Sequence, residues 1–215
     1  RTFQKDLVWT PVYGQKLKTK KGKIYTGTIL EHILVQHLVQ FFNVGEHNII
    51  RLEDADWNDG LDMAKERGES VAFMSFYGGN LIALADLLSD LSIARGMSEI
   101  DLAVEIKTLL DSLTSMHVNY DDPQAKKDYL FEVYFPSVQP AVSGQKMTVA
   151  IKDVIGDLRN KGEWIFSQIR GREKIFVEHK GKSYTWFNGY YDNKGTRVEG
   201  DNGGHGDHFT IAVTW

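Results

Sequence analysis

The stretch Ala55-Asp56-Trp57-Asn58-Asp59-Gly60-Leu61-Asp62 is the most distinctive part of this sequence. It lies in a long polar segment, residues 43–69, between two apolar patterns whose spacing predicts helices over about residues 26–42 and 70–94. Loops of this length within a compact domain are usually functional or disordered. Because Ile49, Ile50 and Leu52 tie the start of the segment to a core, we expect a functional loop.

Further along the chain, the sequence predicts two more helices, over about residues 98–116 and 147–169, and a short strand between them at Phe131–Phe135. Thr26 is the expected N-cap of the first helix, and Gly96 is expected to end the second. Within the second helix, Gly78-Gly79 would weaken it or let another backbone approach.

The pattern changes towards the C-terminus. Lys174–His179 and Ser183–Trp186 flank Lys180-Gly181-Lys182, which predicts a hairpin, and Asp192–Gly195 predicts a second turn. We therefore expect one region over residues 1–215, helical over 26–169 and β-rich over 170–215, and incomplete as a domain because four long helices are too few to close a toroid. The predicted class is mainly α: an α/α-barrel (toroid) or part of one, with its first three helices packed antiparallel as neighbouring staves.

Composition narrows the functional classes. The chain has 42% hydrophobic and 25% charged residues and a net charge of −4, as in ordinary globular proteins. Its only dense basic run, residues 16–23, has no interleaved aromatic residues, so we expect no nucleic-acid partner. The lack of cysteine excludes disulfides and thiolate metal sites and fits a cytoplasmic location. We expect no apolar run long enough to span a bilayer, and no membrane partner.

Five carboxylates lie on either side of one indole within residues 53–62, which we call the acidic stretch: Glu53, Asp54, Asp56, Asp59 and Asp62 around Trp57. Neighbouring like charges raise the pKa of a carboxyl group, and an Asp with a raised pKa can keep a proton at neutral pH and donate it. In an extended segment Trp57 and Asp59 face the same side. The indole could then stack on a sugar while Asp59 reaches its glycosidic oxygen.

Two simpler interpretations compete with this one. Asp54, Asp56 and Asn58 fit the first ligand positions of a calcium-binding loop, but Asp59 and Lys65 stand where that loop needs Gly and Glu. We therefore expect no metal site there. The other alternative is a solvated acidic turn, because Asp-Gly is ordinary turn chemistry.

Three segments, in order, resemble the catalytic domain of glycoside hydrolase family 94, which contains cellobiose and chitobiose phosphorylases. The first is Thr28-Ile29-Leu30-Glu31-His32, continuing through Gly45-Glu46-His47. The second is the central stretch, residues 55–62, followed by Arg67-Gly68-Glu69-Ser70-Val71. The third is Gly189-Tyr190-Tyr191-Asp192-Asn193-Lys194-Gly195. The second segment is the most specific, because both of its parts occur together at a spacing close to that of the family.

The resemblance implies inverting phosphorolysis of β-linked gluco-oligosaccharides in an α/α-barrel. The general acid of the family maps onto Asp59 and its sugar-stacking tryptophan onto Trp57, with Asp56, Asn58 and Glu31 as further substrate-binding candidates. The partners implied are an oligosaccharide and inorganic phosphate as co-substrate, with no cofactor and with room for a homodimer. The product would be a sugar 1-phosphate.

Two alternatives stay open at this point. An inverting hydrolase would need a second carboxylate roughly 6.5–9.5 Å from Asp59, for which Glu31 and Asp54 are candidates. A non-catalytic carbohydrate-binding fragment would keep the motifs without the reaction. The upstream sugar contacts and the downstream phosphate-binding segment of the family have no match here. We therefore expect the isolated chain to be far less active than the complete protein.

Overall fold

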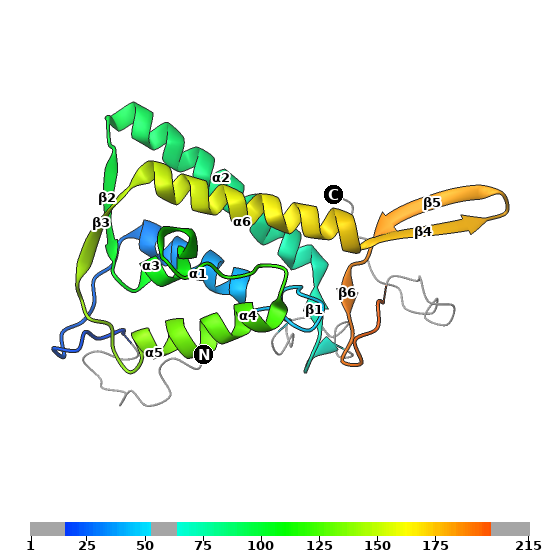
Figure 1. Ribbon diagram of the computed structural model, residues 1–215, viewed down its shortest axis with the longest axis horizontal. Coiled ribbons are helices and arrows are strands. Elements are labelled where there is room, and N and C mark those ends of the chain that lie inside the picture. The colour runs from blue at the N-terminus through cyan, green and yellow to red at the C-terminus, as the bar shows by residue number, and fades with distance from the viewer. Residues whose placement is uncertain (1–15, 53–63, 199–215) are drawn as a thin grey trace.

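The computed structural model describes residues 16–52 and 64–198. Two long helices, α2 (Val71–Arg95) and α6 (Ile151–Arg172), lie side by side along one edge of the molecule (Figure 1). The shorter helix α1 (Ile29–Phe42) lies beneath them. The residues Asp56, Trp57, Asn58 and Asp59 fall outside the described part of the chain, so their predicted roles stay predictions.

Helix α1 begins with a capping box. The Thr28 side chain accepts a hydrogen bond from the Glu31 backbone N–H, and the Glu31 side chain accepts one from the Thr28 N–H. The prediction of Thr26 as the cap is therefore wrong by two residues. The buried face of α1 repeats at helical spacing through Leu34, Leu38 and Phe41.

The antiparallel contact between α2 and α6 is unusually close. A Cβ on Gly78 would lie 2.7 Å from Ile165, and one on Gly162 would lie 2.7 Å from Ile82 and 3.0 Å from the Gly78 carbonyl oxygen. Two small residues thus let the helices approach at one level, as predicted for Gly78. Gly96 ends α2 in the left-handed conformation, at φ 63°, which confirms that boundary.

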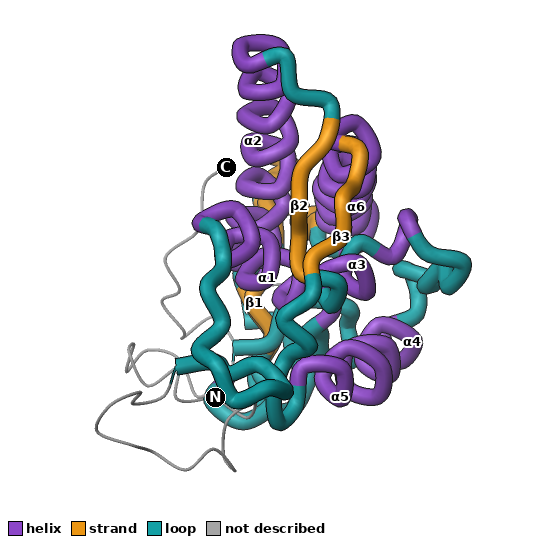
Figure 2. Tube along the Cα trace, turned by 90° about the vertical axis from the view of Figure 1, so that its left-hand side faces the viewer, coloured by secondary structure: helices purple, strands orange, loops and turns teal. Residues whose placement is uncertain are grey.

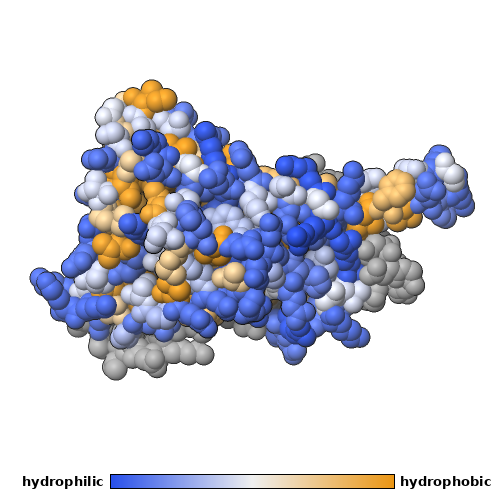
Figure 3. All heavy atoms as spheres, in the orientation of Figure 1, coloured by the Kyte–Doolittle hydropathy of each residue, from blue (hydrophilic) through white to orange (hydrophobic). Residues whose placement is uncertain are grey.

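Helix α2 overturns the expectation that no apolar run could span a bilayer. By length and composition alone it is long and apolar enough, and it is the only such helix in the described ranges. Those properties also fit a core helix, and 44% of its apolar window is buried inside the fold. Its outer side keeps Leu87, Leu91 and Ile93 exposed, and Figure 3 shows hydrophobic residues gathered at that end of the molecule.

The helix predicted over residues 98–116 does not form. Strand β2 (Glu99–Ala103) instead pairs antiparallel with β3 (Lys146–Ala150), and only the short helices α3 (Ile106–Leu109) and η2 (Asp111–Leu113) follow it. The two strands form a ribbon that joins the end of α2 to the start of α6 (Figure 2). The expected stave beside α2 is therefore α6, which also starts four residues later than predicted because Met147 lies in β3.

A continuous helical stretch replaces the strand predicted at Phe131–Phe135. It consists of α4 (Pro123–Asp128), a π-helix η3 (Tyr129–Tyr134) and α5 (Phe135–Val138). The Asp122 side chain caps its start by accepting the N–H groups of Gln124 and Ala125. Its buried residues Leu130 and Tyr134 are four apart, which is helical spacing.

The hairpin and turn predicted near the C-terminus are confirmed. Strand β4 (Lys174–His179) pairs with β5 (Lys182–Phe187), and the Asp192–Gly195 turn closes with a 3.0 Å backbone hydrogen bond. Strand β6 (Tyr190–Tyr191) returns to pair with β1 (Glu69–Ser70). The described chain is about half helical, with two-stranded sheets only. Closure into a barrel and a domain division at residue 170 stay predictions.

The helix contact yields a paired prediction within α6. We expect Gly162→Ala to lower the free energy of unfolding by about 1–2 kcal/mol, because the new methyl group meets Ile82 and the α2 backbone. Gly156→Ala is the matched control. Nothing lies within 4 Å of its Cβ, so helix propensity should raise the stability by about 0.5–1 kcal/mol. Urea unfolding measures both, and equal effects of the same sign would contradict the close contact.

Candidate functional site

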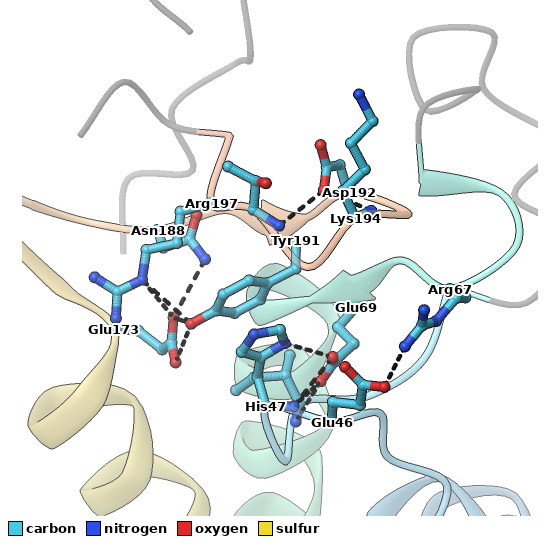
Figure 4. Close-up of polar contacts among 12 residues, drawn as sticks. Glu46, His47, Arg67, Glu69, Glu173, Asn188, Tyr191, Asp192, Lys194 and Arg197 are labelled. Atoms are coloured by element: carbon cyan, nitrogen blue, oxygen red, sulfur yellow. Dashed lines mark hydrogen bonds and ion pairs between the residues drawn. The ribbon is translucent and has the colours of Figure 1, made fainter. Parts of the chain in front are cut away.

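Parts of the three segments that carry the family resemblance meet at one place in the structure (Figure 4): Gly45-Glu46-His47, the residues from Arg67 to Val71, and Gly189–Gly195. Glu69 in β1 pairs with Tyr191 in β6, and Arg51 forms a bridge to Glu69 from the other side. The loop around Gly45-Glu46-His47 folds over the same point. The structure thus joins residues that are more than 140 positions apart in the chain.

A buried carboxylate holds this junction. Glu69 is only 2% exposed and accepts hydrogen bonds from the backbone N–H of His47 at 3.1 Å and of Ile49 at 3.0 Å. It also accepts one from His47 Nδ1 at 2.8 Å. A Cβ on Gly45 would lie 2.3 Å from the Glu69 carboxyl carbon, so the loop can wrap this side chain only with glycine there.

These contacts fix the orientation of the His47 imidazole. An ionised carboxylate can only accept hydrogen bonds, so Nδ1 of His47 carries the proton and Nε2 is left for another partner. The ring stacks on Tyr191, with 3.7 Å between the ring centroids and 7° between the planes. The His47 side chain is 31% exposed, so Nε2 is an accessible base when neutral and a donor to an anion when protonated.

Tyr191 is held in turn by the end of α6. Its hydroxyl donates to Glu173 at 2.9 Å, and Asn188 donates to the same carboxylate at 3.2 Å. The Arg197 Nε donates to the Tyr191 hydroxyl at 3.2 Å. Burial, with the Glu173 charge, raises the pKa of Tyr191 to about 12. The phenol therefore remains a neutral hydrogen-bond donor at neutral pH.

The residues on either side of the acidic stretch (residues 53–62) are anchored at this junction. Leu52 and Ala64 are buried, and Gly68 links them by accepting from the Leu52 N–H at 2.8 Å and donating to the Ala64 carbonyl at 2.9 Å. The Asn193 side chain accepts the N–H groups of Glu66 and Arg67, both at 2.8 Å. The turn of the third segment therefore clamps the chain just after the acidic stretch.

A small polar pocket of about 160 Å³ opens beside these anchors. Its cationic side chains come from separate segments: Arg51 precedes the acidic stretch, Arg67 follows it, and Lys127 belongs to α4. His47, Glu46 and Glu69 complete the polar wall, and Arg67 forms an ion pair with Glu46. The size and charge of the pocket suit a small oxyanion. Sequence reasoning missed Arg51, His47 and Lys127 as a group, because no motif links Lys127 to the other two.

The structure places Glu31 elsewhere. Besides capping α1, its carboxylate accepts from the Ala103 N–H at 2.6 Å, from the Tyr25 hydroxyl at 3.0 Å and from the Lys146 ammonium. Burial alone would raise the pKa of Glu31, but these hydrogen bonds outweigh it and lower the pKa. Glu31 lies in the first turn of α1, so by the helix rise about 16 Å of helix separate it from the end of α1, after which the loop with His47 begins.

Glu31 also lines a second cavity, of about 400 Å³, with walls that include Val35, Ile106 and Val142. The structure therefore does not bring Glu31 together with the anchors of the acidic stretch. The next residue of the same motif, His32, is exposed.

A buried lysine, Lys126, contacts the loop that carries His47 through the neighbouring Asn48. Lys126 is fully buried, donates to Asn48 at 3.2 Å, and lies 4.2 Å from the ring centroids of both Phe41 and Trp164. Burial, together with the charge of Lys161, lowers its pKa well below the usual value. Lys161 is also fully buried, but its charge is matched by Asp111 at 2.7 Å and Asp157 at 2.6 Å.

Residues 12–101 match the model of the glycosyl hydrolase 94 superfamily, catalytic domain. The resemblance to this family is confirmed over that part of the chain. The matched range contains the acidic stretch, His47 and Glu69, whereas Lys127, Glu173 and Tyr191 lie outside it. No curated protein matches the chain. The glycosyl hydrolase 94 match supports a carbohydrate-active enzyme of glycoside phosphorylase or hydrolase type.

The central role of Glu69 can be tested by stability. We expect Glu69→Gln to lower the free energy of unfolding by about 1–3 kcal/mol, because an amide nitrogen would replace one acceptor facing the His47 loop. Glu66→Gln, three residues earlier and exposed, should change it by less than about 0.5 kcal/mol. Chemical unfolding measures both variants, and similar losses in the two would show that Glu69 has no special role.

The buried amine of Lys126 predicts a pH dependence. Its pKa is lower in the folded than in the unfolded state, so between those two values the unfolded state binds more protons and stability rises with pH. Lys126→Met removes this contribution. The variant should therefore gain stability relative to the parent at low pH, and the gain should shrink as the pH rises towards about 10. Unfolding at several pH values checks this, with the exposed Lys152→Met as a control that should show no such trend.

Proposed function

We propose that this chain carries the general acid of an inverting glycoside phosphorylase that acts on β-linked gluco-oligosaccharides. Asp59 protonates the leaving glycosidic oxygen while an oxygen of inorganic phosphate attacks the anomeric carbon from the opposite face. The C–O bond to the leaving sugar breaks as the bond to phosphate forms, which gives a sugar 1-phosphate of inverted configuration. Trp57 stacks on the sugar, and Asp56 and Asn58 bind its hydroxyl groups.

The pocket lined by Arg51, Arg67 and Lys127, which we call the cationic pocket, is the observation that supports phosphorolysis. Its Arg51 and Arg67 flank the acidic stretch on either side, and Lys127 adds a third positive charge. An anionic nucleophile needs such charges close to the general acid, whereas an attacking water does not. A protonated His47 Nε2 would add a fourth donor to a phosphate oxygen.

A hydrolase has less support from the described residues. It needs a second carboxylate as a base for water, roughly 6.5–9.5 Å from the acid. Glu69 is the most buried carboxylate of the pocket, but backbone N–H groups and His47 occupy its oxygens. Glu46 is in an ion pair with Arg67. Phosphate as nucleophile requires neither of them to act as a base.

The proposal is tested in the complete protein with a β-linked glucose disaccharide. Sugar 1-phosphate should form only when phosphate is supplied. Asp59→Asn should lower kcat by about 10²-fold or more, because it removes the proton donor and keeps the shape. Trp57→Ala should mainly raise KM for the sugar, because it removes a stacking surface. Release of free glucose without phosphate would replace the phosphorylase with a hydrolase.

The role of the cationic pocket can be measured in the same assay, through KM for phosphate. Arg51→Met and Lys127→Met should each raise KM for phosphate by about tenfold while KM for the sugar stays near the parent value, because each removes a charge from the pocket alone. Lys152→Met, on the exposed side of α6, is the control and should change neither constant. A rise in both KM values together would place the phosphate elsewhere.

A further inference from the structure

We propose that the β4–β5 hairpin is a self-association arm that pairs, edge to edge along β4, with the same strand of a second copy of this chain. The hairpin projects from the body beyond the end of α6 (Figure 1). Phe176 and Tyr184, one on each strand, are 62% and 47% exposed, and Figure 3 shows hydrophobic residues on this arm. An isolated two-stranded hairpin is at best marginally stable in water, so further pairing would stabilise it.

The turn chemistry determines which backbone groups remain for a partner. Lys180 and Gly181 both have positive φ, at 50° and 72°, which is the two-residue turn that matches the strand twist. The flanking pair, His179 and Lys182, then exchanges both hydrogen bonds, and the alternation continues two residues further along each strand.

It follows that the N–H and C=O groups of Val177 and Ile175 point to β5. Those of Lys174, Phe176 and Glu178 point to the outer edge of β4. In the described residues no third strand occupies that edge. The edge therefore presents the backbone N–H and C=O groups of three alternate residues, with Phe176 in the middle, to a further strand.

The side chains on this edge are self-complementary in one arrangement. In an antiparallel pair of β4 strands centred on Phe176, Lys174 lies opposite Glu178 of the partner subunit, and the two-fold symmetry repeats this ion pair. Ile175 then lies opposite Val177 of the partner subunit. A parallel alignment would place equal charges opposite each other, and a shift of one residue would move each side chain to the other face.

The resulting sheet would have the order β5–β4–β4–β5, with the two copies related by a two-fold axis midway between the two Phe176 residues. This inference does not depend on the proposed reaction, because no residue of the cationic pocket or the acidic stretch takes part. Its partner is a second copy of this chain, since the charge pattern of β4 is complementary to itself.

Cross-linking can identify the pairing, because the chain contains no cysteine. A symmetric hydrogen-bonded pair has its Cα atoms about 5.5 Å apart, which lies within the range that a disulfide spans. Phe176→Cys should therefore form a covalent dimer under mild oxidation. Thr185→Cys is the matched control, because Thr185 lies opposite Phe176 in the hairpin but on the β5 edge. Equal cross-linking of both variants would overturn the proposal.

Charge reversal gives a second measurement that does not depend on a new thiol. We expect Lys174→Glu to weaken self-association, measured by sedimentation over rising concentrations, by about tenfold, since it places like charges opposite each other twice. Adding Glu178→Lys should restore the association of the parent. Circular dichroism confirms that each variant folds. A parent chain that stays monomeric at every concentration, or a double reversal without recovery, would refute the pairing through β4.

Discussion

The carboxylate of Glu69 is the interaction on which the rest of the structure depends. An ionised group without water must have its lone pairs satisfied, and here two backbone N–H groups and an imidazole do so. Satisfying it bends the chain after α1 into a loop, fixes β1 at the start of α2 and turns His47 onto Tyr191. One buried charge thereby links the loop after α1, the start of α2 and the C-terminal segment.

Local signals in the sequence were enough to predict the elements that local interactions form. The apolar spacing of α1 and α2, the glycine that ends α2 and the turn of the β4–β5 hairpin were all recognisable, because each depends on residues within a few positions of one another. Where contacts with residues far away in the chain decide the secondary structure, the sequence pattern predicted the wrong element. Leu102, Ile106 and Leu109 have helical spacing and are all buried, yet pairing with residues 146–150 makes a strand of the first part.

The candidate site shows the same division. The acidic stretch and the segment around Glu69 stand out because their residue types are unusual and close together in the chain. Lys127 and Glu173 could not be found in this way, since an ordinary helix lysine and a glutamate at a helix end carry no sign of what they will meet. Glu31 illustrates the reverse case, in which a residue within a functional motif proves to be a cap and an ion-pair partner.

The two long helices connect the candidate site with the opposite end of the molecule. Helix α2 begins two residues after Glu69, and α6 ends directly before Glu173. The two carboxylates that hold His47 and Tyr191 therefore lie at the ends of two adjacent helices. Where Gly78 and Gly162 bring the helices together, neither can slide without moving a backbone. The β2–β3 ribbon couples their opposite ends. The stacked imidazole and phenol are thus held between the ends of two helices that the ribbon joins again at their far ends.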